Sequence, residues 1–459
     1  MPAMYDALVI GSGMSALTAA RSLSGYRVAL LEARDRVGGR THTASATPQP
    51  VDLGASMIHG YLEGNPAAKL ITRELGMDVH VPEAAKGLVY GSNGPLSETD
   101  AGALFATSTQ NAFSPPASAP TDASIASLLF PKLDDPRLVA LARTAEIGAG
   151  VTLEEQSAKY AGFEEGFKGT DGWPVGGYGG EVVRNLVADF RADGGEVHLK
   201  AEVTAVEDLG AGEGVKVQTR DGKEFTAKVV ISTIPHAVLQ AAPLQFSPPL
   251  SPLFTSAIER MQTGALEKVV LTYPSAWWPS PSETGSFLLL PLSSPSSTAP
   301  SSLRDLFAQT VIPVTSFQRL AATPHPTLLA YLGPVAARAI AGRPAEEVAS
   351  AFHAYLVERL APTSDVPAPT TQLVTSWLTD PFSRGATSTP VVLSRDAHGE
   401  LNSPLDFHIV SRPAWDGRLG WAGEHTSVDN HGSVAGAVIS GRREGERVRE
   451  MLERLAGEA

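Results

Sequence analysis

The residues nearest the N-terminus whose types and spacing suggest chemistry form a short glycine-containing turn. Gly11 and Gly13 follow an apolar run, residues 5–10, and precede Ser15 and Ala16. Gly11 permits a tight turn, Gly13 lets the main chain approach a pyrophosphate, and Ala16 replaces a third glycine that keeps the helix close to the sheet. A helix beginning near Ser15 directs its N–H groups and positive dipole end at phosphates. The pattern therefore predicts a dinucleotide-binding turn.

A single acid and a second glycine pair follow this turn. Glu32 ends the next apolar run, residues 28–31, where dinucleotide-binding units place an acid against a ribose hydroxyl. Gly38 and Gly39 then allow the main chain to pass close to a ligand, and Arg40 can fork onto a phosphate oxygen. Nicotinamide binding does not require this second loop. The order of features predicts a strand, a turn, a helix and a strand that position a dinucleotide.

Together these residues resemble the flavin-dependent amine oxidases, which include polyamine and monoamine oxidases, and their wider FAD oxidoreductase relatives. The resemblance implies FAD as cofactor and adds Ser15, Ala16 and Arg34 to the cofactor-binding residues. It implies an α/β fold, in which a discontinuous Rossmann-like FAD-binding domain is interleaved with an α+β substrate-binding domain. The family pattern assigns residues 1–80, 172–250 and 405–459 to the FAD-binding domain, and residues 81–171 and 251–404 to the substrate-binding domain.

Composition limits the classes of function. A chain of 459 residues is too long for one compact core and suggests two domains. The net charge of −13 argues against a nucleic acid partner and is compatible with cationic substrates. Because the chain has no cysteine, disulfides, thiolate metal sites and cysteine nucleophiles are excluded, and we expect no metal centre.

Location is also an expectation from the sequence. The first apolar run begins within a few residues of Met1, which leaves no room for a secretory signal, and no apolar run is long enough to span a bilayer. The C-terminal residues do not form a hydrophobic anchor or a peroxisomal Ser-Lys-Leu ending. We therefore expect a cytoplasmic enzyme without a membrane partner.

Periodicity and turn residues predict the remaining elements in outline. The predicted strands are residues 196–200, 203–206, 214–219 and 228–233, and the predicted helices are residues 136–143, 181–193 and a segment that begins at Pro344. Irregular loops are predicted at residues 111–124 and 293–302, which are rich in proline or serine. The strands after residue 196 indicate a sheet that resumes after a helical insertion.

Residues 52–60 resemble the segment that runs along the flavin and into the substrate cavity of polyamine oxidases. The small residues Gly54, Ala55 and Ser56 allow this segment to lie against a flat ring. His59 matches the position where polyamine oxidases place a polar side chain near the substrate amine, which implies a catalytic role. The alternative is a histidine that caps its own turn.

Lys268 is the residue on which the implied mechanism most depends. It lies in an apolar strand, residues 265–273, where a lysine is costly to bury without a partner. In the resembling family the matching lysine hydrogen-bonds a water at flavin N5 and is implicated in reoxidation by oxygen. The alternative is a lysine that extends its charged end from an edge strand into solvent.

Three further segments resemble flavin-facing parts of the family. Residues 173–180 resemble the glycine-rich entry to the second half of the FAD domain, and Val203 matches a position whose main chain holds the adenine. Residues 377–388 match the segment at the dimethylbenzene edge of the flavin, where Trp377 is either a core residue or a cavity wall. Monoamine oxidases bond the flavin to a cysteine in this segment, but this chain has Ala386 or Thr387 there. The resemblance therefore implies non-covalent FAD.

The C-terminal motif completes the implied cofactor site. Gly423 and Glu424 match the residues that meet the ribityl or phosphate region. A helix beginning near Ser433 and Val434 would aim its positive end at the flavin N1 and C2 carbonyl, where negative charge accumulates on reduction. Monoamine oxidases flank the substrate amine with two tyrosines, whereas the aligned positions here are Thr387 and Ser433. This difference disfavours the monoamine oxidase type.

The resemblance implies oxidation of an amine to an imine, which hydrolyses to a carbonyl compound and an amine while oxygen is reduced to hydrogen peroxide. The polyamine-oxidase-like branch is favoured. A primary amine oxidase of broader or long-chain specificity and an L-amino-acid oxidase remain alternatives, although no arginine is identified for a substrate carboxylate. An isoprenoid desaturase or a flavoprotein whose main role is binding are weaker alternatives. The amine itself and the oligomeric state are left open.

Overall fold

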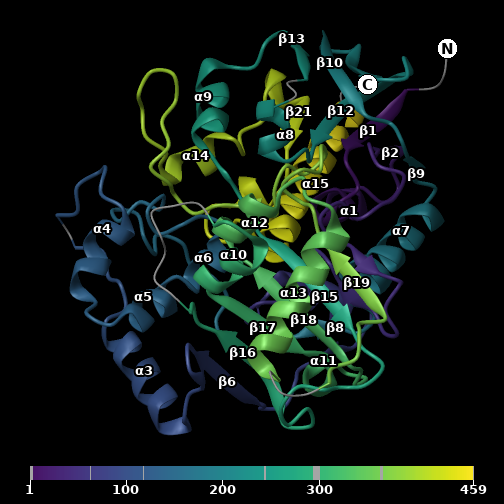
Figure 1. Ribbon diagram of the computed structural model, residues 1–459. Coiled ribbons are helices and arrows are strands. Elements are labelled where there is room, and N and C mark those ends of the chain that lie inside the picture. The colour runs from purple at the N-terminus through teal and green to yellow at the C-terminus, as the bar shows by residue number, and fades with distance from the viewer. Residues whose placement is uncertain are drawn as a thin grey trace.

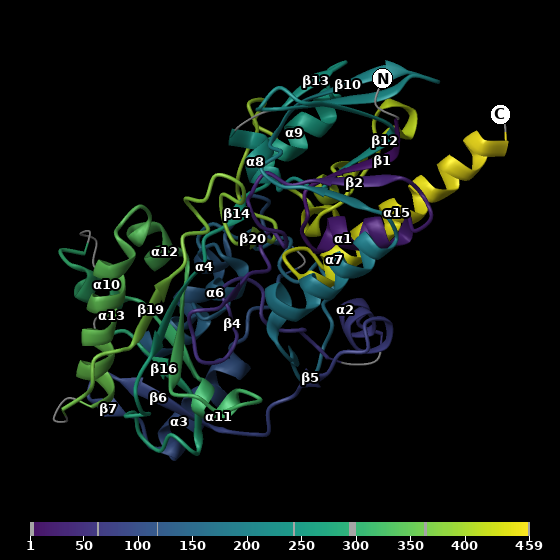
Figure 2. The same ribbon diagram turned by 90° about the vertical axis from the view of Figure 1, so that its right-hand side faces the viewer.

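The computed structural model describes residues 4–61, 64–116, 118–241, 244–292, 300–361 and 365–457. Two large sheets organise this part of the chain, and Figure 2 shows them on opposite sides of the molecule, joined by helices and loops. The fold is therefore mixed α/β with several sheets, as the sequence predicts. Within the described residues, none of the helices is both long and apolar enough to cross a membrane.

The first sheet contains the N-terminal strand at its centre. Its eight strands are β1 (Tyr5–Ile10), β2 (Val28–Leu31), β9 (Glu196–His198), β10 (Val203–Gly210), β11 (Gly214–Thr219), β12 (Glu224–Ser232), β13 (Gln245–Ser247) and β21 (Leu419–Trp421). Strand β1 pairs in parallel with both β2 and β12. Strands β1 and β2 are apolar and nearly fully buried, because helices cover the sheet.

Helices α1 (Met14–Ser22), α7 (Val183–Ala192) and α15 (Val434–Gly457) pack together beside this sheet (Figures 1 and 2). Glycines allow α15 to lie directly against α1. A β carbon on Gly441 would stand 2.4 Å from the carbonyl oxygen of Ser15, and one on Gly445 would stand 2.6 Å from that of Ala19. The two ends of the chain thus share one core.

The second sheet is formed by later and more scattered segments. Its strands are β6 (Lys86–Gly91), β7 (Gly94–Pro95), β15 (Glu267–Thr272), β16 (Thr284–Leu289), β17 (Ile312–Ser316), β18 (Thr327–Leu332) and β19 (Thr371–Val374). Helices α10 (Leu303–Gln309) and α13 (Ala345–Leu360) pack on one of its faces (Figure 1). The core residues Phe352 and Leu356 of α13 lie on the apolar stripe that begins at Val348.

Shorter elements connect and flank the sheets. The helices are α2 (Pro66–Lys69), α3 (Glu98–Gln110), α4 (Ile125–Leu129), α5 (Pro136–Ala142), α6 (Ala145–Ala149), α8 (His236–Ala241), α9 (Pro252–Arg260), α11 (Phe317–Leu320), α12 (Pro334–Ile340) and α14 (Pro404–Ile409). Three two-stranded sheets pair β3 (Thr43–Ala44) with β4 (Val51–Asp52), β5 (Val79–His80) with β8 (Trp173–Pro174), and β14 (Thr263–Gly264) with β20 (Thr387–Ser388).

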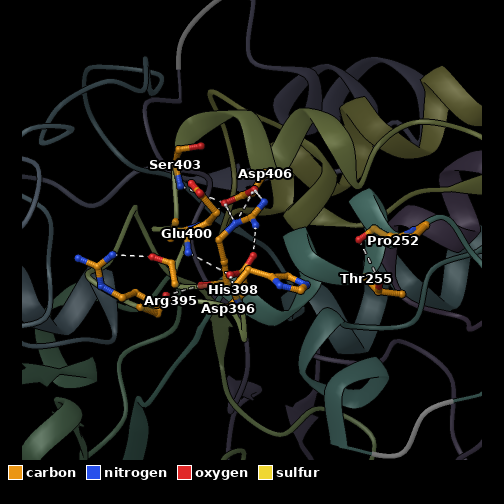
Figure 3. A network of polar contacts seen from close by, with 12 residues as sticks. Pro252, Thr255, Arg395, Asp396, His398, Glu400, Ser403 and Asp406 are labelled. Carbon is orange, nitrogen blue, oxygen red and sulfur yellow. Dashed lines mark hydrogen bonds and ion pairs between the residues drawn. The ribbon is translucent and has the colours of Figure 1, made fainter.

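A buried polar network joins α9, α14 and the loop between β20 and α14 (Figure 3). The guanidinium of Arg260 donates to Asp406 on α14, with Nη2 2.6 Å from Oδ1, and also pairs with Asp396. Asp406 further accepts from Nδ2 of Asn402 at 3.0 Å and from the backbone N–H of Ser403 at 3.0 Å. The network holds the loop that follows β20.

Most predicted elements are confirmed, and the differences have local causes. The strand predicted at residues 196–200 ends at His198, because Lys200 adopts a positive φ of 56°. The helix predicted from Pro344 begins at Ala345 with Pro344 as its N-cap. The helix predicted at residues 181–193 is α7, preceded by a helical turn at Gly177–Val182.

The predicted loops are described only in part. Residues 111–124 are irregular where described, with Ala117 outside the described residues. Most of the loop predicted at residues 293–302, namely residues 293–299, also lies outside them. The strands of the first sheet come from residues 5–31, 196–247 and 419–421, and those of the second from residues 86–95, 267–332 and 371–374. The domain boundaries themselves stay a prediction.

Candidate active site

A cavity of about 610 Å³ lies between the two glycine loops, the C-terminal motif and the second sheet. Most of the residues predicted to bind cofactor or substrate line it: Gly11, Gly13, Ser15, Glu32, Arg34, Gly39, Arg40, Gly54, Ala55, Ser56, His59, Val203, Lys268, Trp377, Gly423, Glu424, Ser433 and Val434. Ala16 lies outside this lining. Its side chain is fully buried in the core around α1, and its place among the cofactor-binding residues stays a prediction.

The two glycines of the first turn have different steric roles. Gly11 has a φ of +108°, and a β carbon there would stand 2.3 Å from Oγ1 of Thr233, so the turn itself requires glycine. A β carbon on Gly13 would meet no protein atom nearer than the Gly38 carbonyl oxygen at 3.9 Å. The space beside Gly13 is therefore part of the cavity.

We expect Gly13→Ala to weaken FAD binding without unfolding the protein. Gly13 has an extended backbone that alanine adopts, so the flavin-free variant should keep its stability within about 1 kcal/mol. The added methyl group occupies ligand space, and we expect the FAD dissociation constant to rise at least about 10-fold, or about 1.4 kcal/mol. Fluorescence titration with FAD measures this change.

Gly25→Ala is the control for the general effect of adding a methyl group. Gly25 has a φ of +87°, nothing lies within 4 Å of its β-carbon position, and it is outside the cavity lining. Its substitution should strain the backbone but leave FAD affinity unchanged. Equal FAD affinities for the Gly13→Ala variant and the parent protein would contradict the placement of Gly13 at the ligand.

The acid after β2 is held by the protein in a fixed orientation. Glu32 is 5% exposed, and its carboxylate accepts a 2.5 Å hydrogen bond from Oγ of Ser12 and a 2.8 Å bond from the backbone N–H of Arg34. The guanidinium of Arg34 forms two bonds to Asp380, at 2.7 and 2.8 Å. Glu32 is thus positioned at the cavity, and the charge of Arg34 is already paired.

Glu424 joins three separate segments at the cavity wall. Its carboxylate lies 2.8 Å from Nη1 of Arg40 and accepts backbone hydrogen bonds from Ser388 at 3.2 Å and Gly432 at 2.7 Å. It also accepts from the hydroxyl of Ser388. Burial alone raises the pKa of Glu424, but the charge of Arg40 and these donors outweigh burial and hold the pKa well below its usual range.

Lys268 reaches the same cavity from the second sheet. Its strand, β15, lies between β18 and β19, and the residue is 5% exposed. Nζ donates to the carbonyl oxygen of Asp52 at 2.9 Å and to that of Gly54 at 2.6 Å. Burial lowers the pKa of Lys268 to about 8, while the nearby Asp52 carboxylate opposes this shift. The alternative of a lysine extending into solvent is therefore wrong.

His59 lies at the exposed side of the cavity. Its side chain is 62% exposed, and Nδ1 lies 3.1 Å from Oδ2 of Asp171. The other carboxylate oxygen of Asp171 accepts from the backbone N–H of Gly60 at 2.9 Å, which excludes a histidine that caps only its own turn. The catalytic role of His59 stays a prediction.

Tyr331 is a cavity residue that sequence reasoning missed. It lies opposite Lys268 in the antiparallel pair of β15 and β18, and Nζ of Lys268 lies 5.5 Å from its ring centroid. Burial raises the pKa of its hydroxyl. No local motif marks this tyrosine, because only the strand pairing brings it to Lys268. Leu266 and Gly148 also line the cavity without a sequence signal.

The segment at residues 377–388 forms one wall of the cavity. Trp377 is 8% exposed and donates from Nε1 to the carbonyl oxygen of Leu53 at 3.1 Å, so it is both a core residue and a cavity wall. Thr387 and Ser433, the two positions that the resemblance aligns with the tyrosines of monoamine oxidases, line the cavity. The hydroxyl of Ser433 accepts from the backbone N–H of Gly436 at 3.0 Å and so caps α15.

These residues fit FAD as the ligand. A diphosphate would fit the open space at Gly13, beside the start of the helix at Met14 and the guanidinium of Arg40. The buried carboxylate of Glu32 suits a ribose. The beginning of α15 at Val434 also faces the cavity, where its positive end suits a group that gains negative charge.

Comparison with known proteins agrees with this arrangement. Residues 14–449 match the family of flavin containing amine oxidoreductases. The chain is 28% identical over 462 residues to probable polyamine oxidase 4 of Arabidopsis thaliana, covering 95% of this chain and 85% of that protein. It is 29% identical over 477 residues to polyamine oxidase 2 of the same plant, covering 97% and 89%.

A third relative, lysine-specific histone demethylase 2 of Homo sapiens, is 27% identical over 474 residues, covering 96% of this chain and 53% of that protein. The family match begins directly after Gly13, spans nearly the whole chain and includes the second glycine loop, Lys268 and the C-terminal motif. The protein therefore belongs to the flavin-containing amine oxidoreductases and is an FAD-dependent enzyme that acts on amines.

Proposed function

We propose that this protein is an oxidase of the polyamine-oxidase-like type, which converts an amine to an imine and reduces oxygen to hydrogen peroxide. The observation that carries the proposal is the position of Lys268, whose ammonium contacts the segment at Asp52 and Gly54 inside the cavity lined by the dinucleotide motif. The similarity to plant polyamine oxidases supports the preference for polyamines. The imine hydrolyses in water to a carbonyl compound and a smaller amine.

FAD held beside Gly13, Glu32 and Arg40 would supply the two-electron redox chemistry of amine oxidation. The protein supplies position and electrostatics. Trp377 and Tyr331 form walls beside Lys268, and the carbonyl groups of Asp52 and Gly54 hold its ammonium in place. Non-covalent FAD is part of the proposal and is supported by the lack of cysteine in the chain.

The Rossmann-like assignment and the cytoplasmic location also belong to the proposal. The parallel pairs of β1 with β2 and β12, followed by α1, support a Rossmann-like arrangement in the first sheet. The location rests on sequence alone, and cell fractionation with antibody detection tests it. An enzyme recovered with membranes would contradict it.

The visible spectrum of the purified protein, recorded without oxygen before and after addition of spermine, tests the proposed function. We expect a flavin band near ~450 nm that bleaches with spermine, and hydrogen peroxide on readmission of air. Bleaching with a long-chain primary amine or an L-amino acid but not with spermine would favour those alternatives. A flavin band that no amine bleaches would contradict amine oxidation.

We expect Lys268→Met to retain a yellow flavin but to slow reoxidation by oxygen at least about 10-fold, a barrier increase of about 1.4 kcal/mol. The variant removes the ammonium and keeps an apolar chain of similar length. In the parent protein the rate of flavin reoxidation should fall as pH rises through about 8, because Lys268 loses its proton in that range. Stopped-flow measurement of reoxidation against pH checks both expectations.

Lys159→Met serves as the matched control, because Lys159 is an exposed lysine outside the cavity lining, with Nζ 5.4 Å from the Tyr160 ring centroid. Its reoxidation rate and pH profile should equal those of the parent protein. Unchanged oxygen kinetics in Lys268→Met would remove the role assigned to Lys268.

A further inference from the structure

The turn at residues 380–386 faces the loop at residues 32–40 across one end of the cavity. Asp380 at one end of the turn pairs with the guanidinium of Arg34 at 2.7 Å. The carbonyl oxygen of Ala386 at the other end accepts from Nη1 of Arg40 at 3.3 Å. Because the loop also carries Glu32, the turn lies at the nucleotide end of the cavity and is tied to it at both ends.

Arg384 stands in this turn with an unusual backbone conformation. Its φ is 52°, in the left-handed region that glycine adopts without penalty and an L-residue does not. The neighbouring main chain is held firmly, since the N–H of Arg384 bonds the Asp380 carbonyl at 2.9 Å and that of Gly385 bonds the Trp377 carbonyl at 2.8 Å. Backbone strain of this kind clusters at ligand-binding and catalytic sites.

Among the five non-glycine residues with positive φ in the described part of the chain, Arg384 is the one that lines the cavity. It is exposed, so its guanidinium is free to move toward a ligand. The other four positions are Lys200, Ser280, Trp415 and Asp416.

The charges around the cavity indicate what Arg384 binds. The lining has the cationic side chains of Arg34, Arg40, Arg220, Lys268 and Arg384 and the carboxylates of Glu32, Glu202 and Glu424. Arg34, Arg40 and Arg220 are paired with carboxylates, and Lys268 is held by two carbonyl groups. Within the described residues, Arg384 is the lining cation for which no such protein partner is found.

We propose that Arg384 binds the diphosphate of FAD and closes the nucleotide end of the cavity against cofactor loss. Guanidinium groups form strong charge-assisted hydrogen bonds with phosphate oxygens. The same group could instead bind a carboxylate on the substrate, but the side chains that contact its turn, Arg34 and Arg40, belong to the loop that carries Glu32. The inference concerns retention of the cofactor and does not depend on which amine is oxidised.

Arg384→Gln tests this role by cofactor affinity, without any assay of turnover. We expect the FAD dissociation constant to rise about 10-fold and FAD release from the diluted holoenzyme, followed by its fluorescence, to accelerate. ADP, which carries a diphosphate, should compete about 10-fold less well, whereas adenosine should compete as it does with the parent protein. Arg384→Lys should recover part of the loss because it restores the charge.

Two further variants separate binding from folding. Arg384→Gly should raise the thermal midpoint of the flavin-free protein, because glycine relieves the backbone conformation, and should still weaken FAD binding. Arg412 is an exposed arginine outside the cavity lining. Arg412→Gln removes the same single positive charge as Arg384→Gln and should leave FAD affinity unchanged. Unchanged FAD and ADP affinities in Arg384→Gln, an equal loss with adenosine, or a loss confined to substrates that carry a carboxylate would each overturn the proposal.

Discussion

Glu424→Ala is expected to lower the free energy of unfolding by about 3–5 kcal/mol and to abolish retention of FAD. The substitution leaves the guanidinium of Arg40 without its 2.8 Å partner and removes the acceptor of the backbone N–H groups of Ser388 and Gly432. Those three segments meet at the cavity through this one carboxylate. Urea unfolding and the flavin absorbance of the purified variant measure the two effects.

The same carboxylate predicts acid sensitivity. Its folded-state pKa lies below the unfolded value, so its stabilisation is present above the unfolded pKa of about 4.5 and is lost as pH falls toward the folded value. The unfolding free energy of the parent protein should therefore fall below pH ~4.5 more steeply than that of Glu424→Ala. Parallel pH profiles for the two proteins would contradict the assignment.

Glu444→Ala is the matched control. Glu444 is a buried carboxylate on α15 that pairs with Arg443 at 3.1 Å and Arg447 at 2.8 Å, outside the cavity lining. The Glu444→Ala substitution should also lower the free energy of unfolding, but the folded fraction of this variant should keep its flavin. Loss of flavin from both variants in the same proportion would show that Glu424 acts only through stability.

Arg260→Ala is expected to cost about 3–5 kcal/mol of unfolding free energy with no direct effect on the cavity. The side chain of Arg260 is 10% exposed and that of its partner Asp406 is 1% exposed, so the substitution leaves a buried carboxylate without its cation. Figure 3 shows that Asp396 of this network also accepts hydrogen bonds from the backbone N–H groups of His398 and Glu400 in the neighbouring loop. Urea unfolding of the holoenzyme measures the loss.

Arg304→Ala provides the comparison on the surface. Arg304 forms two hydrogen bonds to Glu358, at 2.6 and 3.0 Å, but its side chain is 53% exposed. Water can replace those bonds, so the loss should stay within about 1 kcal/mol. Equal losses of unfolding free energy for Arg260→Ala and Arg304→Ala would show that burial does not determine how much the ion pairs of Arg260 stabilise the fold.

Sequence could predict the parts of the site that depend on local patterns. The turn with Gly11 and Gly13, the acid Glu32 and the helix after Ser433 are encoded by neighbouring residues, and the structure has the turn, the strand end and the helix where they were predicted. Such features need no knowledge of distant contacts. The resemblance to the family then predicted that these features share one site with Lys268 and the C-terminal motif.

Other parts depend on contacts between distant segments and could not be predicted. Tyr331 enters the cavity through strand pairing with Lys268, and Asp171 meets His59 through a bridge between Ile58 and Gly172. Lys268 is satisfied by main-chain carbonyl groups, which leave no trace in side-chain identity. A sequence pattern indicates which residues are polar or apolar but not which of them become neighbours.

The packing of α15 against α1 has a consequence for how the chain is made. Strand β1 obtains its partner β12, and α1 its partner α15, only after those later segments have been synthesised. Until then the apolar faces of β1 and α1 lack their native cover, a state that is prone to aggregation. Both elements therefore reach their native contacts late in biosynthesis, and we expect proteins truncated before α15 to depend on chaperones for solubility.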